Sequence, residues 1–143
     1  MQCVVLHQVQ MASTVLLPIA PVAVACGYPS PAQDYYDGPI DLTEKLIDDQ
    51  AATFVVRAAG ESMVNSGISA GDEILVDRSK RPRDGDVVVA VLDGELTIKR
   101  LRITGAGVVL QADNPEFPDV VVPELSELTI WGVATYSLHH LSR

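Results

Sequence analysis

One serine of this chain lies in a glycine-containing turn and is the first residue whose position suggests catalysis. Ser62 belongs to the stretch "AGESMVNSG" at residues 59–67, directly after the apolar run "ATFVV". A serine hydroxyl is a weak nucleophile until a neighbouring base accepts its proton. Serine is also an ordinary turn residue, so the role of Ser62 depends on whether the chain supplies a base.

Histidine is the usual base beside a catalytic serine, but the three histidines here are poorly placed for that role. His7 lies in a segment without charges, and His139 and His140 lie next to the C-terminus, where chains tend to fray. No acidic residue is spaced to orient any of them. We therefore predict that all three are exposed or incidental.

A lysine can replace histidine as the base if it is held as the neutral amine, which requires burial. Lys99 lies in the apolar stretch "ELTIKRLRI", where a period of two places Thr97, Lys99 and Leu101 on one face of a strand without a neighbouring acid. The alternative is an edge-strand lysine that points to water, and periodicity alone does not decide. Lys45 and Lys80 lie among charges and are weaker candidates.

The turn around Ser62 also has backbone groups that suit acyl transfer. Gly60 permits a tight bend before the serine. The backbone amides of Ser62 and Met63 are then candidates for an oxyanion hole, which stabilises the negative charge that develops on a carbonyl oxygen under attack.

The elements that position these residues are predicted to be short strands. The chain has 143 residues, a length typical of one domain, and 48% of them are hydrophobic. Valine-rich runs favour strands, and Asp93-Gly94 between two of them predicts a hairpin. We expect a mainly β fold of curled antiparallel sheets, with strands within residues 53–58, 72–77, 86–92, 95–103, 107–112, 119–123 and 128–138.

The chain before these strands has a different composition. Residues 1–26 contain no Asp, Glu, Lys or Arg. Residues 27–39 are rich in proline and glycine and are predicted to be an extended linker. Residues 40–143 then form the β-rich domain, which begins with a short helical turn capped by Asp41 or Thr43.

Charge and cysteine content exclude several classes of protein. The formal net charge is −9, so we expect no direct binding to nucleic acid. The basic run "RSKRPR" at 78–83 is interpreted as a solvated loop. The two cysteines, Cys3 and Cys26, form no CxxC motif, so we expect no zinc site, no disulfide framework and no cofactor. A reduced, cytoplasmic setting fits best.

The uncharged arm also resembles the apolar core of a signal peptide, and "AVAC" resembles a lipoprotein processing site. No Lys or Arg precedes it, and Pro18 and Pro21 interrupt it, so we expect neither secretion nor a membrane span. A secreted lipoprotein modified at Cys26 stays an alternative. Met11 is an alternative start.

Several motifs in the same order resemble the LexA/UmuD family of self-cleaving Ser/Lys peptidases. They are "GESM" at 60–63, "GISAGDEILVD" at 67–77, "GDVVVAVLDGELTIKRL" at 85–101, "DNPEFPDVVV" at 113–122 and "IWGVAT" at 130–135. The segment "CGYPSPAQDYYDGPIDL" at 26–42 resembles the UmuD-like members in particular. The resemblance covers about residues 24–138.

This resemblance implies that Ser62 is the nucleophile, that Lys99 is the general base, and that the chain cuts itself between Cys26 and Gly27. It implies removal of the arm 1–26, a homodimer, and stimulation by a RecA filament on single-stranded DNA in the SOS response. The processed dimer would be the accessory subunit of an error-prone, UmuC-like Y-family translesion DNA polymerase. The resemblance does not tell whether cutting occurs within or between subunits.

Two related activities fit the sequence less well. A LexA-type repressor needs a DNA-binding domain, and 26 uncharged residues are too few for one. A signal peptidase with a similar Ser/Lys pair needs a membrane anchor. The remaining alternative is a non-proteolytic dimeric binding module on the same fold, in which Ser62 only forms a turn and Lys99 is a surface charge.

Overall fold

The structure is a computed structural model that describes residues 2–8, 14–19, 23–24, 26–27, 38–124 and 126–142. The chain divides into two compact units. The larger unit consists of Met1–Gln10 with Asp49–Arg143, and the smaller consists of Met11–Asp48. The predicted boundary at Cys26 and Gly27 is not tested by this division and stays a prediction.

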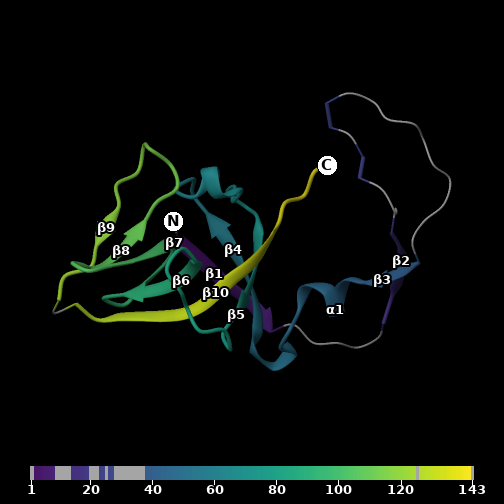
Figure 1. Ribbon diagram of the computed structural model, residues 1–143, viewed down its shortest axis with the longest axis horizontal. Helices are drawn as coiled ribbons and strands as arrows, with labels where there is room; N and C mark the ends of the chain where they lie inside the picture. The colour runs from purple at the N-terminus through teal and green to yellow at the C-terminus, as the bar shows by residue number, and fades with distance from the viewer. Residues whose placement is uncertain are drawn as a thin grey trace. The chain divides into compact units, whose positions relative to one another are not determined.

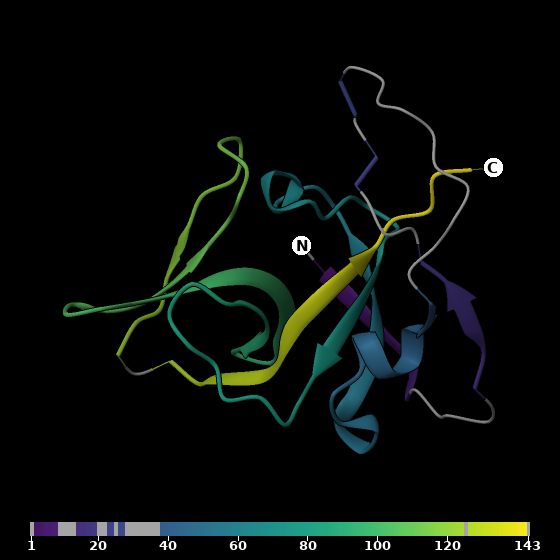
Figure 2. The ribbon, with the colours of Figure 1, turned by 45° about the vertical axis from the view of Figure 1, so that its right-hand side comes forward.

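The larger unit is built on one antiparallel sheet (Figure 1). The described residues give it eight strands in the order β1-β4-β5-β10-β6-β7-β8-β9. Their bounds are β1 Gln2–Gln8, β4 Thr53–Ala59, β5 Glu73–Asp77, β10 Leu128–Leu138, β6 Val87–Leu92, β7 Glu95–Thr104, β8 Gly107–Gln111 and β9 Val120–Val121. The expected mainly β fold of curled antiparallel sheets is confirmed, and Figure 2 shows the bending of β6 and β7.

The hairpin between β6 and β7 forms at the predicted dipeptide. Asp93 and Gly94 have φ angles of 49° and 85°, both in the left-handed region that this turn type requires. The turn fixes the register, in which Val88 lies opposite Lys99 and Val89 lies opposite Ile98. This local signal therefore positions the lysine relative to the neighbouring strand.

The valine-rich run of β6 is apolar throughout because both faces of the strand are buried. Val89 packs in a cluster with Ile98, Met63 and residues of β4 and β5. Val88 packs in a second cluster that includes Leu101 of β7 and Leu110 of β8. A strand covered on both faces needs no polar residue at alternate positions.

Close contact between β10 and β5 explains a glycine in the "IWGVAT" motif. A Cβ atom added to Gly132 would lie 2.5 Å from Cγ1 of the buried Val76. The register of β10 against β6 also shifts between Ile130 and Gly132. Glycine is therefore required here for packing.

The smaller unit contains a two-stranded antiparallel sheet of β2 (Leu16–Pro18) and β3 (Pro39–Asp41), followed by α1 (Leu42–Leu46). Asp41 caps α1, because its side chain accepts hydrogen bonds from the amides of Thr43 and Glu44. The predicted capped turn is confirmed, with Asp41 as the cap. Most of the predicted linker 27–39 lies outside the described residues.

Two short 3-10 helices complete the described chain, η1 at Gln50–Ala52 and η2 at Val64–Ser66. None of the helices in the described ranges is long and apolar enough to cross a membrane. The sequence did not predict β1 or β2, because the uncharged arm has no clear period of two, and it did not predict β3, which has only three residues.

Candidate active site

Ser62 lies in the connection between β4 and η2. β4 ends at Ala59, and Gly60 turns the chain with a φ of 88°. Met63 is the N-cap of η2, and Gly67 ends this helix in the left-handed conformation. Ser62 is only 1% exposed, so this turn holds a buried hydroxyl rather than a solvated one.

Lys99 approaches Ser62 from β7, which lies inside the sheet between β6 and β8. The distance between Lys99 Nζ and Ser62 Oγ is 3.1 Å. The amine also contacts Thr97 Oγ1 at 3.1 Å and the Ile98 carbonyl oxygen at 3.3 Å. Lys99 is 6% exposed. The alternative of an edge-strand lysine in water is therefore wrong.

Among the described residues, the surroundings of the amine contain hydrogen-bond partners but no counter-charge. No carboxylate of the described residues lies within the 4.0 Å of an ion pair with Lys99 Nζ. A neutral amine held 3.1 Å from the hydroxyl oxygen can accept the proton of that hydroxyl.

Backbone amides next to the hydroxyl have no partner in the described chain. Neither the Ser62 nor the Met63 amide donates a hydrogen bond to another described residue, whereas the Val64 amide donates to the Glu61 carbonyl oxygen at 3.4 Å. These two amides match the residues predicted for the oxyanion hole. That role stays a prediction.

The loop after β8 braces the turn that carries Ser62. Asn114 Nδ2 donates to the Glu61 carbonyl oxygen at 2.8 Å. The Asn65 amide donates to the Asp113 carbonyl oxygen at 2.8 Å. The Asp113 amide donates to Sδ of the buried Met63 at 3.4 Å. Contacts on both sides of Ser62 therefore fix the turn to β8.

An ion pair next to Lys99 adds to this brace. Arg100 Nε donates to Asp113 Oδ2 at 2.8 Å, and Ser66 Oγ donates to the same carboxylate. Arg100 also donates to Ser66 Oγ at 3.0 Å and to the Gly85 carbonyl oxygen at 2.6 Å. Burial by itself raises the pKa of Asp113, but the hydrogen bonds from Ser66 and Arg100 outweigh it and hold the pKa below 3.8.

Sequence reasoning missed Asp113 and Asn114. The stretch "DNPEFP" at 113–118 belongs to one of the family motifs, but the motif by itself assigns no role to Asp113 or Asn114. Their partners in the Ser62 turn lie about fifty residues earlier in the chain, so no local pattern indicates these contacts. An Asp-Asn pair at the end of a strand is the only signal, and it is typical of many turns.

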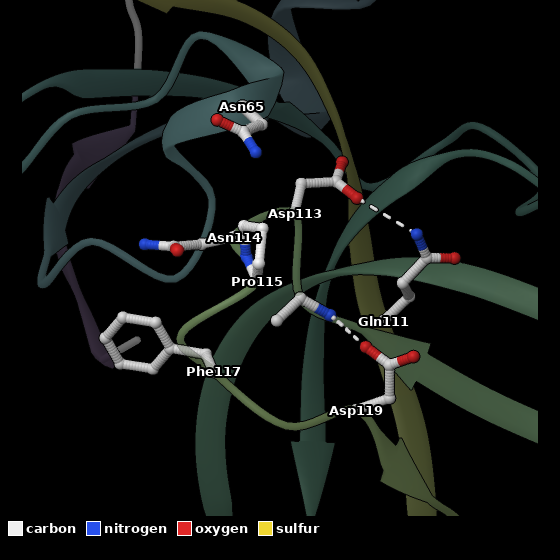
Figure 3. A pocket seen from close by; sticks show the side chains of 8 residues that line it. Asn65, Gln111, Asp113, Asn114, Pro115, Phe117 and Asp119 are labelled. Atoms are coloured by element: carbon white, nitrogen blue, oxygen red, sulfur yellow. Dashed lines mark hydrogen bonds between the residues drawn. The ribbon is translucent and has the colours of Figure 1, made fainter.

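A polar cavity of about 580 Å³ lies beside this brace (Figure 3). Figure 3 shows Asn114 and Phe117 on one side of Asp113, and Gln111 and Asp119 on the other. Gln111 donates to Asp113 at 3.2 Å, and Asp119 accepts from the Ala112 amide at 3.0 Å. The side chains of Gln111, Asp113 and Asp119 in its wall are thus engaged in holding the loop.

The predicted cut lies in the smaller unit. Cys26 is exposed, and its Sγ lies 4.0 Å from the Val24 carbonyl oxygen. A Cβ atom added to Gly27 would meet nothing within 4 Å. The segment therefore does not need glycine in this conformation, and its role as the cleavage site stays a prediction.

One histidine has a partner that the sequence did not predict. His139 Nδ1 lies 2.6 Å from Oδ1 of the buried Asp72. Burial by itself raises the pKa of Asp72, but a hydrogen bond from the Ser69 amide and the contact with His139 outweigh it, so the pKa lies below 3.8. The prediction that His139 is exposed is confirmed, and its ring also contacts a buried carboxylate that the sequence did not indicate.

The remaining candidate side chains are exposed or lie outside the described residues. His140, Lys45 and Lys80 are exposed. The side chains of Cys3 and His7 lie outside the described residues. Within the ranges that the structure covers, no three His, Cys, Asp or Glu side chains form a group that could hold a metal ion.

The comparison with protein families agrees with this geometry. A family model described as Peptidase S24-like matches residues 18–135, which include the turn, β7 and the bracing loop. The chain belongs to this family. The resemblance to UmuD-like members of the LexA/UmuD family is thereby confirmed.

Relatives of this S24-like chain cover most of its length. It is 43% identical over 114 residues to Protein ImpA of Salmonella typhimurium, which covers 79% of this chain and 77% of ImpA. It is 44% identical over 113 residues to Protein SamA of Salmonella typhimurium strain LT2, covering 79% and 78%. It is 38% identical over 113 residues to the LexA repressor of Dechloromonas aromatica, covering 78% of this chain and 56% of the repressor.

Proposed function

We propose that this S24-like protein is a self-cleaving serine peptidase in which Ser62 is the nucleophile and Lys99 is the general base. The observation that carries the proposal is the distance of 3.1 Å between Lys99 Nζ and Ser62 Oγ, with both residues buried. A nucleophile and a base within hydrogen-bond reach are the minimum requirement for this chemistry. The bond we propose for cleavage joins Cys26 to Gly27.

The reaction proceeds in two stages. Ser62 Oγ attacks the Cys26 carbonyl carbon while neutral Lys99 accepts the hydroxyl proton. The amides of Ser62 and Met63 stabilise the oxyanion. Lys99 then gives its proton to the Gly27 nitrogen as the peptide bond breaks, leaving an ester between Ser62 and Cys26. Water, deprotonated by Lys99, hydrolyses this ester and frees the Cys26 carboxyl group and the Ser62 hydroxyl.

Docking of the cleavage segment is the controlling step in this proposal. Attack needs the carbonyl carbon about 3–3.5 Å from the hydroxyl oxygen. Cys26 is exposed and Gly27 is uncrowded, so the segment is available for another position. A partner that binds the docked state raises its population. We propose a RecA filament on single-stranded DNA as that partner.

The processed protein would serve a different partner. We propose that it forms a homodimer and is the accessory subunit of an error-prone Y-family translesion polymerase in the SOS response. The resemblance of residues 24–138 to UmuD-like proteins supports this proposal, and ImpA and SamA each align with 79% of the chain.

The test measures the mass of the purified chain before and after incubation at alkaline pH, and with RecA, nucleotide and single-stranded DNA. We expect a new product that begins at Gly27, at a rate that rises with pH because more of the amine is neutral. Ser62→Ala should give no product. A chain that stays intact under both conditions contradicts the proposal and favours the non-proteolytic binding module.

A further inference from the structure

The strand β1 covers an edge of the sheet that the rest of the fold leaves open. β4 has β5 on one side and β1 on the other, and β1 is the last strand in that direction. Figures 1 and 2 show β1, in purple, alongside β4. The pairing runs from Gln2 opposite Ala59 to Gln8 opposite Phe54, with one shift between Val5 and His7. It therefore covers almost all of β4.

The backbone groups that β1 covers follow from the hydrogen bonds on the other side of β4. The Ala58 amide donates to the Asp72 carbonyl oxygen at 2.8 Å, and the Ala58 carbonyl oxygen accepts from the Gly71 amide at 2.8 Å. Both groups of Ala58 therefore face the β5 side. Successive residues of a strand alternate in this direction, so the amides and carbonyl groups of Val55, Arg57 and Ala59 face β1.

Without β1, β4 would be an unusually open edge. Exposed edges are normally blunted by proline, bulges, short length or several charges. β4 is seven residues long, "TFVVRAA", without proline and with one charge, Arg57. Its pairing with β5 runs without a shift in register. Such an edge can pair with another extended chain through its backbone.

The position of β1 in the sequence connects this edge to processing. β1 ends at Gln8, before the proposed cut between Cys26 and Gly27. In the intact chain the covalent connection keeps β1 at a high effective concentration beside β4. After the cut, β1 is held only by non-covalent contacts, which are its pairing with β4 and its contacts with β7. The family match begins at residue 18 and does not include β1.

We propose that β1 is a releasable edge strand, and that cutting the chain uncovers β4 as a docking edge for an extended strand of a partner polypeptide. Residues 2–8 are the occupant in the intact chain, and the partner's strand takes the same place in the processed protein. The unmasking step rests on the proposed function, whereas the masking of β4 by β1 does not.

The first experiment tests masking in the full chain carrying Ser62→Ala, which keeps it intact whatever its activity. Val4 lies opposite Arg57, whose backbone groups face β1, so Val4→Pro removes a donor from the ladder. We expect amide hydrogen exchange at Val55, Arg57 and Ala59 to become at least about tenfold faster. The amides of Phe54, Val56 and Ala58 face β5 and should keep their protection.

Val5→Pro is the matched control, because Val5 lies opposite Val56 and its amide points away from β4. It should change exchange less than Val4→Pro does. Unchanged exchange at Val55, Arg57 and Ala59 in Val4→Pro overturns the proposal. If Val4→Pro does not fold, a chain that starts at Met11 and so lacks β1 gives the same readout with the same two outcomes.

The second experiment tests unmasking in the wild-type protein after self-cleavage. We expect the N-terminal fragment to separate on gel filtration and the amides of Val55, Arg57 and Ala59 to exchange fast. Excess synthetic peptide with the sequence of residues 1–10 should restore their protection. A fragment that stays bound, or protection that persists after the fragment is gone, overturns the unmasking step. Absence of cleavage contradicts only the proposed function, because the first experiment does not depend on it.

Discussion

The turn that carries Ser62 and the segment that carries Cys26 and Gly27 are held in opposite ways. The turn is buried, and three hydrogen bonds from the loop after β8 fix it on both sides of the serine. The segment is exposed, and Gly27 has open space around its Cα atom. The chemical groups are thus preorganised, whereas the bond proposed for cleavage is not.

This difference indicates where control of the reaction lies. Preorganised groups need no rearrangement at the moment of reaction, so they contribute fully to lowering the barrier. A segment with few contacts can change position at low cost, so its docking is open to control by a partner. The Ser62 turn therefore determines the rate of the chemical step, and the position of the cleavage segment determines when that step can occur.

The largest expected effect is the loss of self-cleavage when the base in the Ser62 site is removed. Lys99→Met keeps a side chain of similar length in the buried site but removes the base, so self-cleavage should slow by about 10³-fold or more. The rate is measured by mass spectrometry at alkaline pH. Lys45→Met, at an exposed lysine of the smaller unit, is the control and should cleave at the normal rate. Equal rates in the two variants would show that Lys99 is not the base.

A glycine-to-alanine substitution should destabilise the chain at a packed glycine of the large sheet but not at the cleavage segment. Gly132→Ala places a Cβ atom against Val76, so we expect the free energy of unfolding to fall by about 1–3 kcal/mol. Gly27→Ala should leave it unchanged within about 0.5 kcal/mol, because nothing lies within 4 Å. Both are measured by urea unfolding.

Gly105→Ala is the control for this pair, since a Cβ atom there also meets nothing within 4 Å. If Gly27→Ala destabilises the chain as much as Gly132→Ala does, the cleavage segment is not the loosely held region described above. A slower self-cleavage in Gly27→Ala at unchanged stability would instead show that the docked state needs the small residue.

A moderate effect should follow from loosening the brace. Asn114→Ala removes the hydrogen bond to the Glu61 carbonyl oxygen, and we expect self-cleavage to slow about tenfold because the hydroxyl is less well positioned. Asn65→Ala is matched in type and lines the same cavity, but its side chain makes no hydrogen bond within the described chain. Equal rates for the two variants would mean that the loop does not position Ser62.

The smallest expected effect is a change in the free energy of unfolding at acid pH. The pKa of Asp113 lies below its ordinary value of 3.8 in the folded protein, so its contribution to stability is present above that value and is lost as pH falls below it. The difference in free energy of unfolding between wild type and Asp113→Asn should therefore shrink between pH 7 and about pH 3. Glu116→Gln, at an exposed acid, is the control. A difference that does not change with pH would contradict this assignment.

Local patterns were sufficient to predict the strands and the main turn. Apolar runs rich in valine and isoleucine predicted seven of the strands near their observed positions. Asp93-Gly94 predicted the hairpin that sets the register between β6 and β7. The period of two correctly predicted that Thr97 and Lys99 lie on one face of the strand, since Lys99 Nζ lies 3.1 Å from Thr97 Oγ1. It did not show that Lys99 is buried, because that depends on β8 and on the turn of Ser62.

Features that rest on distant pairing were not predictable. β1 pairs with a strand about fifty residues later, and "QCVVLHQ" shows no alternation by itself. The contact of His139 with Asp72 joins residues 67 apart. In each case, the fold brings together residues that are distant in the sequence, and no local pattern indicates the contact.

The two ends of the large sheet differ in how they resist unwanted association. At one end β9 has only two residues and lies between Pro118 and Pro123, so it offers little backbone for another chain to extend. The end at β4 has no such protection beyond β1. Stored preparations of the cut protein should therefore form edge-to-edge aggregates through a single end of the sheet, and a soluble strand peptide in the buffer should suppress them.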